Sequence, residues 1–313
     1  MVGGATPSIP LVAIVGPTGV GKTALALRLA PRFNGEIVGA DSRQVYRGMD
    51  IGTGKPTAEE RAAVPHHLVD VADPDEEFNV SFFQAQATAA VEEVHGRGRL
   101  PFLVGGTGHY VWALLEGLRL PQVPPNLELR RDLAAIAEEE GGLDFLHAQL
   151  ADLDPVAAAR IDPRNARRVI RAIEVSRATG LPFSQVGTRE PPPYRGLIIG
   201  LTCPREELYR RIDARVDAMV ARGWVDEVRR LMDRGYGLDL PSMSSLGYRE
   251  IAMVVEGRLG LEEAVARVKM ETHRFARRQY GWFRLTDPRI RWLDITACTE
   301  EKAEEWVREF LDS

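Results

Sequence analysis

Short hydrophobic runs alternate with helix-like segments over roughly the first third of the chain. Each run has the length and apolar composition of a buried strand, and the segments between the runs carry apolar residues at helical spacing. The four predicted strands are Leu11–Val15, Glu36–Ala40, His67–Val71 and Pro101–Val104. The two clearest helices are Ala24–Ala30 and Ser81–His95, the second with Ser81 as its expected N-cap. This alternation predicts a parallel sheet with helical crossovers.

The pattern changes after Pro121. From Asn126 to Thr179 the chain has helical spacing and contains no strand-like run. Strands are predicted again at Leu197–Leu201 and Arg291–Ile295, and helices at Pro204–Arg234, Leu261–Arg284 and Glu300–Leu311. We therefore predict an α/β core domain made of residues 8–122 and 183–313, interrupted by an all-helical insertion domain at residues 123–182.

Composition narrows the setting. The chain has 313 residues, of which 44% are hydrophobic, enough for a sizeable core. Cys203 and Cys298 lie far apart and form no metal-binding motif, which is typical of a reducing compartment. The sequence shows no secretion signal and no apolar stretch of about 18 residues that would predict a membrane span. We expect a cytoplasmic monomer that does not bind membranes.

Charge is segregated along the chain, although the net charge is only −5. Residues 160–190 hold seven arginines against three acids, and residues 267–291 hold eight basic residues against two acids. The acids gather at residues 128–154 and 292–313. Two basic zones on an acidic protein favour a bound polyanion such as nucleic acid. The alternative is that both zones are solvated helix faces.

A glycine-rich loop follows the first predicted strand and precedes a predicted helix, the context of a phosphate-binding loop. It fits the pattern G-x-x-x-x-G-K-[ST] with Gly16, Pro17, Thr18, Gly19, Val20, Gly21, Lys22 and Thr23. The glycines permit backbone conformations closed to other residues, so the loop N–H groups approach phosphate oxygens. Lys22 supplies a positive charge, and the Thr23 hydroxyl suits a Mg²⁺ ligand at the start of the helix. The residues predict a diphosphate or polyphosphate site and leave open which of the two is bound.

Two other strand ends carry residues suited to a ligand, because ligands of open parallel sheets gather at the carboxyl ends of the strands. One strand leads into Gly105-Gly106-Thr107-Gly108, where the glycines suit a backbone close to a ligand. Asp41 follows another strand and is the only acid at a suitable strand end. A nucleotide hydrolase normally places an acid after a buried strand. Here the buried strand Pro101–Val104 ends in Gly-Gly-Thr-Gly instead, which is unusual for an ATPase.

These blocks occur in an order that resembles the bacterial tRNA dimethylallyltransferases, also called tRNA isopentenyltransferases. The phosphate loop is followed by Asp-Ser-Arg-Gln-Val-Tyr at 41–46, Asp-Ile-Gly-Thr-Gly-Lys-Pro at 50–56, His-His-Leu-Val-Asp at 66–70 and Gly-Gly-Thr-Gly-His-Tyr at 105–110. The series continues with Arg-Ala-Ile-Glu-Val at 171–175, Ser-Leu-Gly-Tyr-Arg at 245–249 and Arg-Arg-Gln-Tyr-Gly-Trp-Phe-Arg at 277–284. The resemblance covers residues 10–295. It implies a P-loop NTPase-like core and transfer of a dimethylallyl group from dimethylallyl diphosphate to N6 of the tRNA adenosine just 3′ of the anticodon (position 37).

The resemblance implies that the phosphate loop holds the departing diphosphate rather than ATP. Mg²⁺, Lys22 and Thr23 would stabilise the negative charge of that leaving group. Arg211 and Arg215 stand where the family's diphosphate-binding arginines stand, and ion pairs with Glu207, Asp213 or Asp217 are the alternative for both.

The candidate catalytic residues are Asp41, Thr18 and Lys22. Asp41 would accept the proton of the adenine amine, and its alternatives are a helix N-cap or a group that contacts Mg²⁺ through water. Thr18 and Thr107 would line the reaction centre. Ser42 and Gln44 would read the adenine edge, because an amide offers both a donor and an acceptor.

The target base must leave the anticodon stack to react, which requires a grip on the surrounding tRNA. The predicted tRNA-binding residues are Asp41, Ser42, Arg43, Gln44, Thr107, Arg130, Arg164, Arg167, Arg168, Arg171, Arg249, Arg277 and Arg278. Arg164, Arg168 and Arg171 are expected to share one helix face through their spacing. Trp282 and Phe283, beside the second basic zone, are predicted to pack in the core rather than to stack on bases.

Two other functions fit parts of the sequence. A small-molecule or nucleotide kinase would share the phosphate loop and the Asp41 region, with Arg205–Arg215 as an arginine lid, but would have little use for a basic insertion. An RNA-binding ATPase or chaperone would explain the basic zones, but not the Gly-Gly-Thr-Gly strand end.

Overall fold

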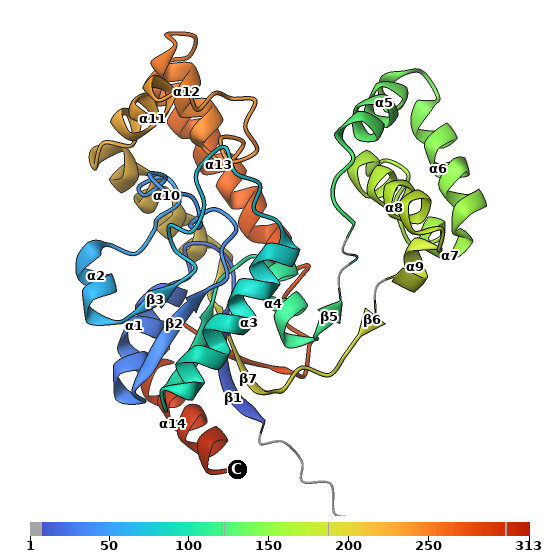
Figure 1. Ribbon diagram of the computed structural model, residues 1–313. Helices are drawn as coiled ribbons and strands as arrows, with labels where there is room; N and C mark the ends of the chain where they lie inside the picture. The colour runs from blue at the N-terminus through green and yellow to red at the C-terminus, as the bar shows by residue number, and fades with distance from the viewer. Residues whose placement is uncertain (1–7, 120, 122, 187, 298) are drawn as a thin grey trace, which may run out of the picture. The chain divides into compact units, whose positions relative to one another are not determined.

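The computed structural model describes residues 8–119, 121, 123–186, 188–297 and 299–313. Contacts within the chain divide it into two compact units. The core unit runs up to Leu115 and resumes at Pro192–Ser313, and the helical unit is Glu116–Pro191 (Figure 1).

Six parallel strands form the sheet of the core unit, in the order β3-β2-β4-β1-β7-β8. They are β1 (Ile9–Val15), β2 (Gly35–Gly39), β3 (His66–His67), β4 (Leu100–Val104), β7 (Tyr194–Thr202) and β8 (Ile290–Asp294). Five of the predicted strands are confirmed within a few residues. The prediction of His67–Val71 is wrong beyond its first residue, because Leu68 and Asp70 have φ values of 62° and 57°, which an extended strand does not tolerate.

Side chains alternate between the two faces of the sheet, and helices cover both. Leu11 and Ala13 of β1 belong to a cluster with α3 (Val80–Gly96) and α4 (Gly108–Leu115). Val12 and Ile14 belong to a second cluster with α1 (Lys22–Arg32) and α14 (Thr299–Asp312). Helices on both faces are the arrangement expected of a parallel sheet.

Local capping residues set the helix boundaries. The N-cap of α3 is Asn79, whose Oδ1 accepts from the backbone N–H groups of Ser81 and Phe82 at 3.0 and 3.1 Å, so the prediction of Ser81 as cap is wrong. A short helix that the hydrophobic pattern does not predict, α2 (Ala58–Ala63), is held by a capping box between Thr57 and Glu60.

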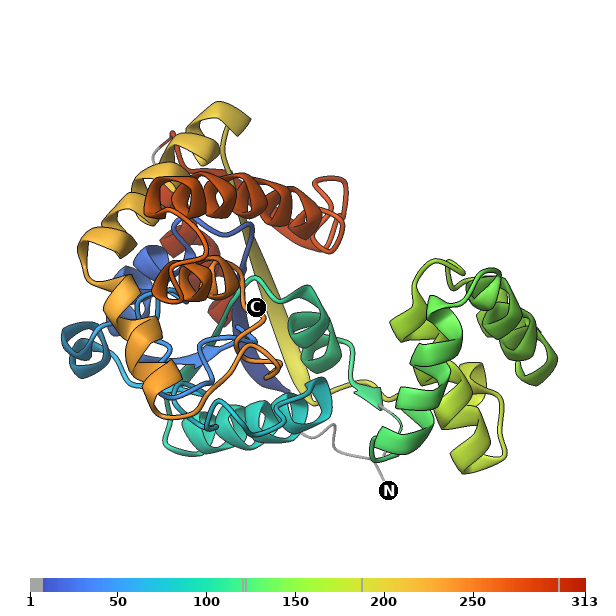
Figure 2. The same cartoon turned by 90° about the horizontal axis from the view of Figure 1, so that it is seen from above.

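Four helices form a layer at the carboxyl edge of the sheet (Figure 1), and Figure 2 looks down on this layer. They are α10 (Arg205–Ala221), α11 (Trp224–Asp233), α12 (Tyr248–Val255) and α13 (Leu261–Gln279). The layer has its own hydrophobic cluster around Trp224 and Tyr248, to which Val45 and Met49 after β2 contribute. The helices predicted within Pro204–Arg234 are confirmed as α10 and α11, and Gly223 at φ 94° lies at the boundary between them.

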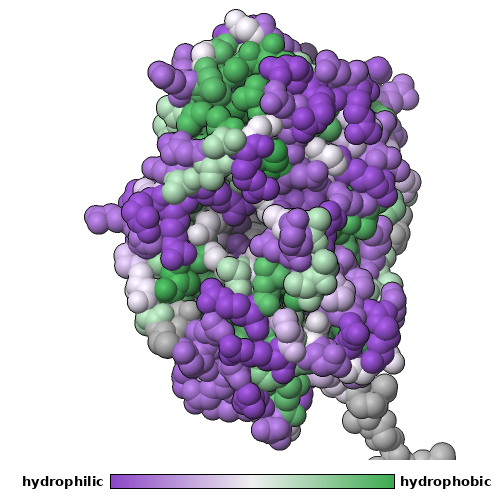
Figure 3. All heavy atoms as spheres, turned by 90° about the vertical axis from the view of Figure 1, so that its left-hand side faces the viewer, coloured by the Kyte–Doolittle hydropathy of each residue, from purple (hydrophilic) through white to green (hydrophobic). Residues whose placement is uncertain are grey.

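The outer surface of this region is polar over most of its area, as amphipathic helices require. Figure 3 shows hydrophilic side chains across one face of the molecule, with a hydrophobic area at its top over α11 and α12. Val225, Met232 and Val254 of these two helices are partly buried members of the cluster described above. None of the helices in the described part of the chain is long and apolar enough to cross a membrane.

The helical unit packs around one cluster that includes Leu146, Leu150, Val169 and Ile173. Its helices are α5 (Leu127–Glu138), α6 (Gly142–Leu153), α7 (Pro155–Ala158), α8 (Ala166–Thr179) and α9 (Phe183–Val186). The two ends of the unit form an antiparallel pair, β5 (Leu118–Arg119) with β6 (Thr188–Arg189). This pair joins the entering and leaving chain, and the helical unit of residues 116–191 contains the predicted insertion at 123–182.

Candidate active site

The carboxyl ends of three neighbouring strands are hydrogen-bonded to one another. The backbone N–H of Gly105 donates to Ile14 at 3.2 Å, and that of Thr107 donates to Ala40 at 3.3 Å. The Thr107 hydroxyl oxygen accepts from the Ser42 N–H at 3.1 Å. The phosphate loop after β1, the Asp41 segment after β2 and the glycine segment after β4 are thereby brought to one edge of the sheet.

A cavity of about 530 Å³ opens at this edge, within the core unit. From the strand ends it is lined by Thr18, Lys22, Asp41, Ser42, Arg43, Gly106 and Thr107, and from the helical layer by residues that include Ile212, Arg215, Val216, Met219, Trp224, Arg249, Val268, Arg278 and Gln279. Its size falls in the range of small-molecule sites. The structure thus places most of the residues predicted from the strand ends around one cavity.

The phosphate loop adopts the conformation that its glycines allow. Gly16, Gly19 and Gly21 have φ values of 140°, 81° and 104°. A Cβ on Gly16 would lie 2.5 Å from the carbonyl oxygen of Leu201, so a side chain there would displace the backbone. The loop closes on its own lysine, since Lys22 Nζ donates to the carbonyl oxygens of Gly16 and Pro17 at 3.0 and 2.9 Å.

Burial lowers the pKa of Lys22 to about 8, although the negative charge of Asp41 works in the opposite direction. Burial likewise lowers the pKa of Arg215, again opposed by Asp41. Two cations with costly desolvation therefore lie near Asp41 at the edge of the cavity. An anionic ligand between them would recover part of that cost.

Asp41 caps a turn. Its Oδ1 accepts from the backbone N–H groups of Arg43 and Gln44 at 2.9 and 3.4 Å. The residues that follow form a turn and not a helix, so the alternative of a helix N-cap is wrong in detail. Within the described residues both of these hydrogen bonds go to Oδ1, which leaves Oδ2 for a proton or a substrate atom.

Gln279 is the residue at the site whose role the sequence does not indicate. It is 4% exposed, at the end of α13. Its Oε1 accepts from the Thr18 N–H at 2.7 Å, and its Nε2 donates to the Gly106 carbonyl oxygen at 2.8 Å. One amide therefore joins the phosphate loop to the loop after β4. The available signal was an uncharged polar residue on the buried side of an otherwise amphipathic helix.

The two arginines of α10 predicted to bind diphosphate differ in their surroundings. Arg215 lines the cavity and donates from Nη2 to the carbonyl oxygen of Thr53 at 3.3 Å. Arg211 donates from Nε to Glu207 at 2.7 Å, as the ion-pair alternative expects, yet a Cβ on Gly21 would lie 3.9 Å from its Nη1. Arg211 is thus both paired and next to the phosphate loop.

The other two acids of α10 named as alternative partners contact a different helix. Asp213 lies 2.8 Å from His273 Nε2, and Asp217 lies 2.7 Å from Lys269 Nζ. Both partners belong to α13, so these contacts join the two helices, and no carboxylate of α10 is found paired with Arg215 within the described residues.

The segment after Asp41 is partly engaged within the protein. Gln44 donates from Nε2 to the carbonyl oxygens of Thr53 and Gly54 at 3.3 and 3.1 Å, and it does not line the cavity. Arg43 lines the cavity and donates to the Pro241 carbonyl oxygen at 2.9 Å. The amide nitrogen of Gln44 thus holds a turn, and its reading of adenine stays a prediction.

Arg249 and the arginines of the second basic zone are exposed. Arg249 and Arg278 line the cavity, whereas Arg277 does not. Phe283 is 1% exposed, as predicted, but Trp282 is 50% exposed and stacks on His109 with ring centroids 5.9 Å apart. The prediction that Trp282 packs in the core is wrong, because α13 ends at Gln279 and the following turn points this ring outward.

In the helical unit, two of the arginines predicted to contact RNA form ion pairs with a buried glutamate. Glu174 is 1% exposed and accepts from Arg130 through both oxygens at 2.9 Å, and it also pairs with Arg171. Arg164 precedes α8 and pairs with Asp162 at 2.8 Å, so it does not share a helix face with Arg168 and Arg171.

Arg167 and Arg168 are exposed on the first turn of α8. They are the members of the predicted set in this unit for which no ion pair is found within the described residues.

A glycine loop that closes on a partly buried lysine between β1 and α1, at the carboxyl edge of a parallel sheet, defines an α/β protein of the P-loop class. Comparison with known proteins narrows the class. The sequence model of the IPP transferase family matches residues 44–286, and that of isopentenyl transferase matches residues 9–68. The chain therefore belongs to the tRNA dimethylallyltransferase (IPP transferase) family, as its motifs predict.

Individual relatives match over nearly the whole chain. A tRNA dimethylallyltransferase of Roseiflexus sp. (strain RS-1) is 57% identical over 306 residues, which cover 97% of this chain and 100% of the relative. Among solved structures, the tRNA isopentenylpyrophosphate transferase of Bacillus halodurans has 44% identity and a TM-score of 0.72, with 97% of both chains covered. A eukaryotic dimethylallyltransferase, described as acting on tRNA, has 30% identity and a TM-score of 0.79, with 96% of this chain and 78% of that chain covered.

Proposed function

We propose that this chain transfers a dimethylallyl group from dimethylallyl diphosphate to N6 of the adenosine at position 37 of tRNA. The observation that carries the proposal is one cavity in which two partly buried cations, Lys22 and Arg215, lie near Asp41 and face a group of apolar side chains. Such a cavity suits a substrate with a diphosphate at one end and a short hydrocarbon at the other. The names of the relatives support the same reaction.

The cationic side of the cavity is suited to the diphosphate. Lys22, Arg215 and the N–H groups of the phosphate loop would bind its oxygens, with Arg211 beside Gly21 in reach of the same anion. These groups hold their positions before the reaction, so they stabilise the charge that develops on the leaving group without rearrangement.

The residues present fit a magnesium ion held largely by the substrate. The described residues contain no group of three His, Cys, Asp or Glu side chains that would hold a metal alone. Thr23, in the first turn of α1, offers a hydroxyl, and Mg²⁺ commonly combines one such ligand with phosphate oxygens and water. When bound, the ion would add positive charge beside the departing diphosphate.

The apolar wall comes largely from one face of α10. Ile212, Val216 and Met219 recur at helical spacing along the cavity, and Trp224 and Val268 complete the lining on this side. This wall would hold the dimethylallyl group away from water, which limits hydrolysis of the donor.

Asp41 is the candidate base of the transfer. The C–N bond forms between N6 and C1 of the donor as the C1–O bond breaks, and the electron pair of that bond leaves with the diphosphate. The N6 proton passes to Asp41, whose Oδ2 is the oxygen not used by the turn.

Binding of tRNA is assigned to exposed arginines of both units. Arg249, Arg277 and Arg278 of the core unit and Arg167 and Arg168 of the helical unit suit phosphate contacts. The reacting adenine would leave its stack and enter the cavity beside Thr107 and Ser42. We further propose that the enzyme works as a monomer in the cytoplasm, where tRNA is available.

The direct test incubates the protein with Mg²⁺, dimethylallyl diphosphate and unmodified tRNA, then digests the RNA and measures N6-isopentenyladenosine. Product without a nucleotide requirement supports the proposal, whereas ATP turnover without RNA modification would indicate a kinase or an ATPase.

The Asp41→Asn variant separates the base from the turn cap, because Asn keeps an Oδ1 acceptor for the two N–H groups. We expect the transfer rate to fall by about 10²–10⁴-fold, while the tRNA dissociation constant changes by less than about twofold. A large loss of tRNA affinity in this variant would reassign Asp41 to recognition.

A further inference from the structure

The segment 50–55, which belongs to one of the sequence blocks above, forms a tight turn beside the cavity. The Gly54 N–H donates to Ile51 at 3.0 Å, the Lys55 N–H donates to Asp50 at 3.0 Å, and the Thr53 hydroxyl donates to Met49 at 2.6 Å. Gly52 and Thr53 line the cavity, although neither carries a group that the reaction requires. The turn therefore needs a role other than chemistry.

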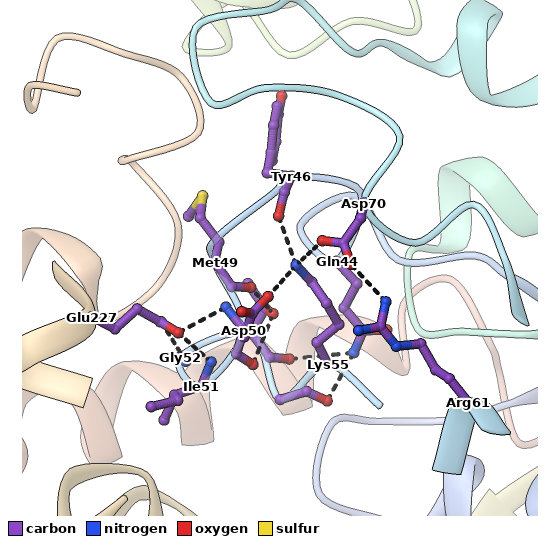
Figure 4. A network of polar contacts seen from close by, with 12 residues as sticks. Gln44, Tyr46, Met49, Asp50, Ile51, Gly52, Lys55, Arg61, Asp70 and Glu227 are labelled. Atoms are coloured by element: carbon purple, nitrogen blue, oxygen red, sulfur yellow. Dashed lines mark hydrogen bonds and ion pairs between the residues drawn. The ribbon is translucent and has the colours of Figure 1, made fainter. Parts of the chain in front are cut away.

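A buried carboxylate from the helical layer holds the first half of this turn. Glu227 of α11 is 3% exposed. Its oxygens accept from the backbone N–H groups of Asp50, Ile51 and Gly52 at 2.9, 2.6 and 3.1 Å (Figure 4). They also accept from the Tyr248 hydroxyl at 2.8 Å. Consecutive N–H groups converging on one carboxylate form an anion-binding nest, here filled from within the protein.

A buried ammonium group holds the second half. The side chain of Lys55 is 1% exposed, and its Nζ donates to the Tyr46 carbonyl oxygen at 2.8 Å and to carboxylate oxygens of Asp50 and Asp70 at 2.6 Å each. Asp70 is also paired with Arg61 at 2.7 Å (Figure 4). The turn is thus fixed at both ends by charge-assisted hydrogen bonds, which are stronger than neutral ones.

What the turn presents to the cavity is the carbonyl oxygen of Thr53. It accepts from Arg215 Nη2 at 3.3 Å. Gly54 lies directly against the same guanidinium, since a Cβ at its position would be 1.9 Å from Nη2. In the described part of the chain this is the hydrogen bond that orients Arg215, so its remaining N–H groups are left for an anion.

We propose that Glu227 is a positioning residue for diphosphate binding, acting through the 50–55 turn to hold Arg215 at the angle at which it meets the anion. Glu227 itself touches no substrate. The proposal rests on the proposed function in taking diphosphate as the ligand, and it adds a residue that neither the motifs nor the cavity lining indicates.

The test is a double-mutant cycle of Glu227 and Arg215. For each variant, isothermal titration calorimetry measures the dissociation constant of inorganic diphosphate in the presence of Mg²⁺. In Glu227→Gln, the amide NH₂ would face a backbone or hydroxyl donor in either orientation, so the turn has to shift. We expect the dissociation constant of diphosphate to rise about 10- to 100-fold, the loss expected when a charge-assisted hydrogen bond is disturbed. In an Arg215→Ala background, the same substitution should add less than about twofold.

Asp226→Asn is the matched control, because Asp226 is the preceding residue of α11 and its exposed carboxylate pairs with Arg229 on the same helix. It should leave diphosphate binding unchanged. Gly54→Ala is the second variant in case Glu227→Gln does not fold. Its added methyl group displaces Arg215 while Glu227 is intact. It should weaken diphosphate binding when Arg215 is present, but not in the Arg215→Ala variant.

A Glu227→Gln variant with wild-type diphosphate affinity overturns the proposal, as does a loss of the same size with and without Arg215. The assay needs neither tRNA nor prenyl transfer. If the wild type binds diphosphate and the cycle is non-additive but no tRNA is modified, the proposed function fails and this inference stands.

Discussion

Replacing Gln279 by Leu tests whether the phosphate loop is held from the helical layer. Leu has nearly the same volume and cannot make either hydrogen bond of the amide. The substitution leaves the Gly106 carbonyl oxygen and the Thr18 N–H without their present partners. No large cavity is created, so the effect reports on the two hydrogen bonds.

The magnitude follows from how accessible each partner is to water. The bond to Gly106 is buried, and an unpaired buried acceptor costs about 1–3 kcal/mol. The bond to Thr18 is only partly buried, so water replaces part of it and the cost is up to about 1 kcal/mol. We therefore expect the free energy of unfolding to fall by about 1–4 kcal/mol and the KM for the donor to rise, because Thr18 belongs to the loop that binds the diphosphate.

The assay is urea unfolding followed by circular dichroism, with steady-state kinetics in parallel. Glu263→Gln on the exposed face of α13 is the control, and it removes only a surface ion pair with Arg267. Unfolding within about 0.5 kcal/mol of the wild type, together with an unchanged donor KM, would refute the view that Gln279 fastens the loop.

Two further predictions concern charge. Because burial lowers the pKa of Lys22 to about 8, the free site carries this positive charge below that pH and loses it above. We therefore expect kcat/KM for the donor to fall as the pH rises through 8. An active Lys22→Arg variant should shift this fall to higher pH. An activity profile flat to pH 10 would contradict this assignment. Burial alone would raise the pKa of Glu174, but hydrogen bonds from Arg130 and Arg171 lower that pKa on balance. The carboxylate therefore stabilises the fold above its unfolded pKa of 4.5, and this stabilisation is lost as the pH falls through the lower folded pKa. Glu174→Gln should destabilise the helical unit by about 1–3 kcal/mol, after allowance for the partial exposure of both arginines, and thermal unfolding at neutral pH measures it.

The sequence predicts the parts of the site that depend on local geometry. The phosphate loop is recognisable because its glycines, lysine and threonine act within one turn of chain, and Asp41 because a strand end is visible in the hydrophobic pattern. Gln279 and Glu227 hydrogen-bond to residues more than 170 positions away, and the sequence around them does not indicate these partners. The arginines of the insertion show the same limit, since the sequence does not indicate that Glu174 and Asp162 pair with three of them. Their contacts with tRNA stay predictions.

The chain enters the helical unit through β5 and leaves it through β6, and these two strands are paired. Leu118 lies opposite Arg189, and the Glu190 N–H donates to the Gly117 carbonyl oxygen at 3.0 Å. An inserted body whose two ends meet can be removed or exchanged without rerouting the chain that surrounds it. Residues 116–191 can therefore be replaced as one segment, in evolution or by design, while the sheet, the glycine loop and Asp41 stay as they are.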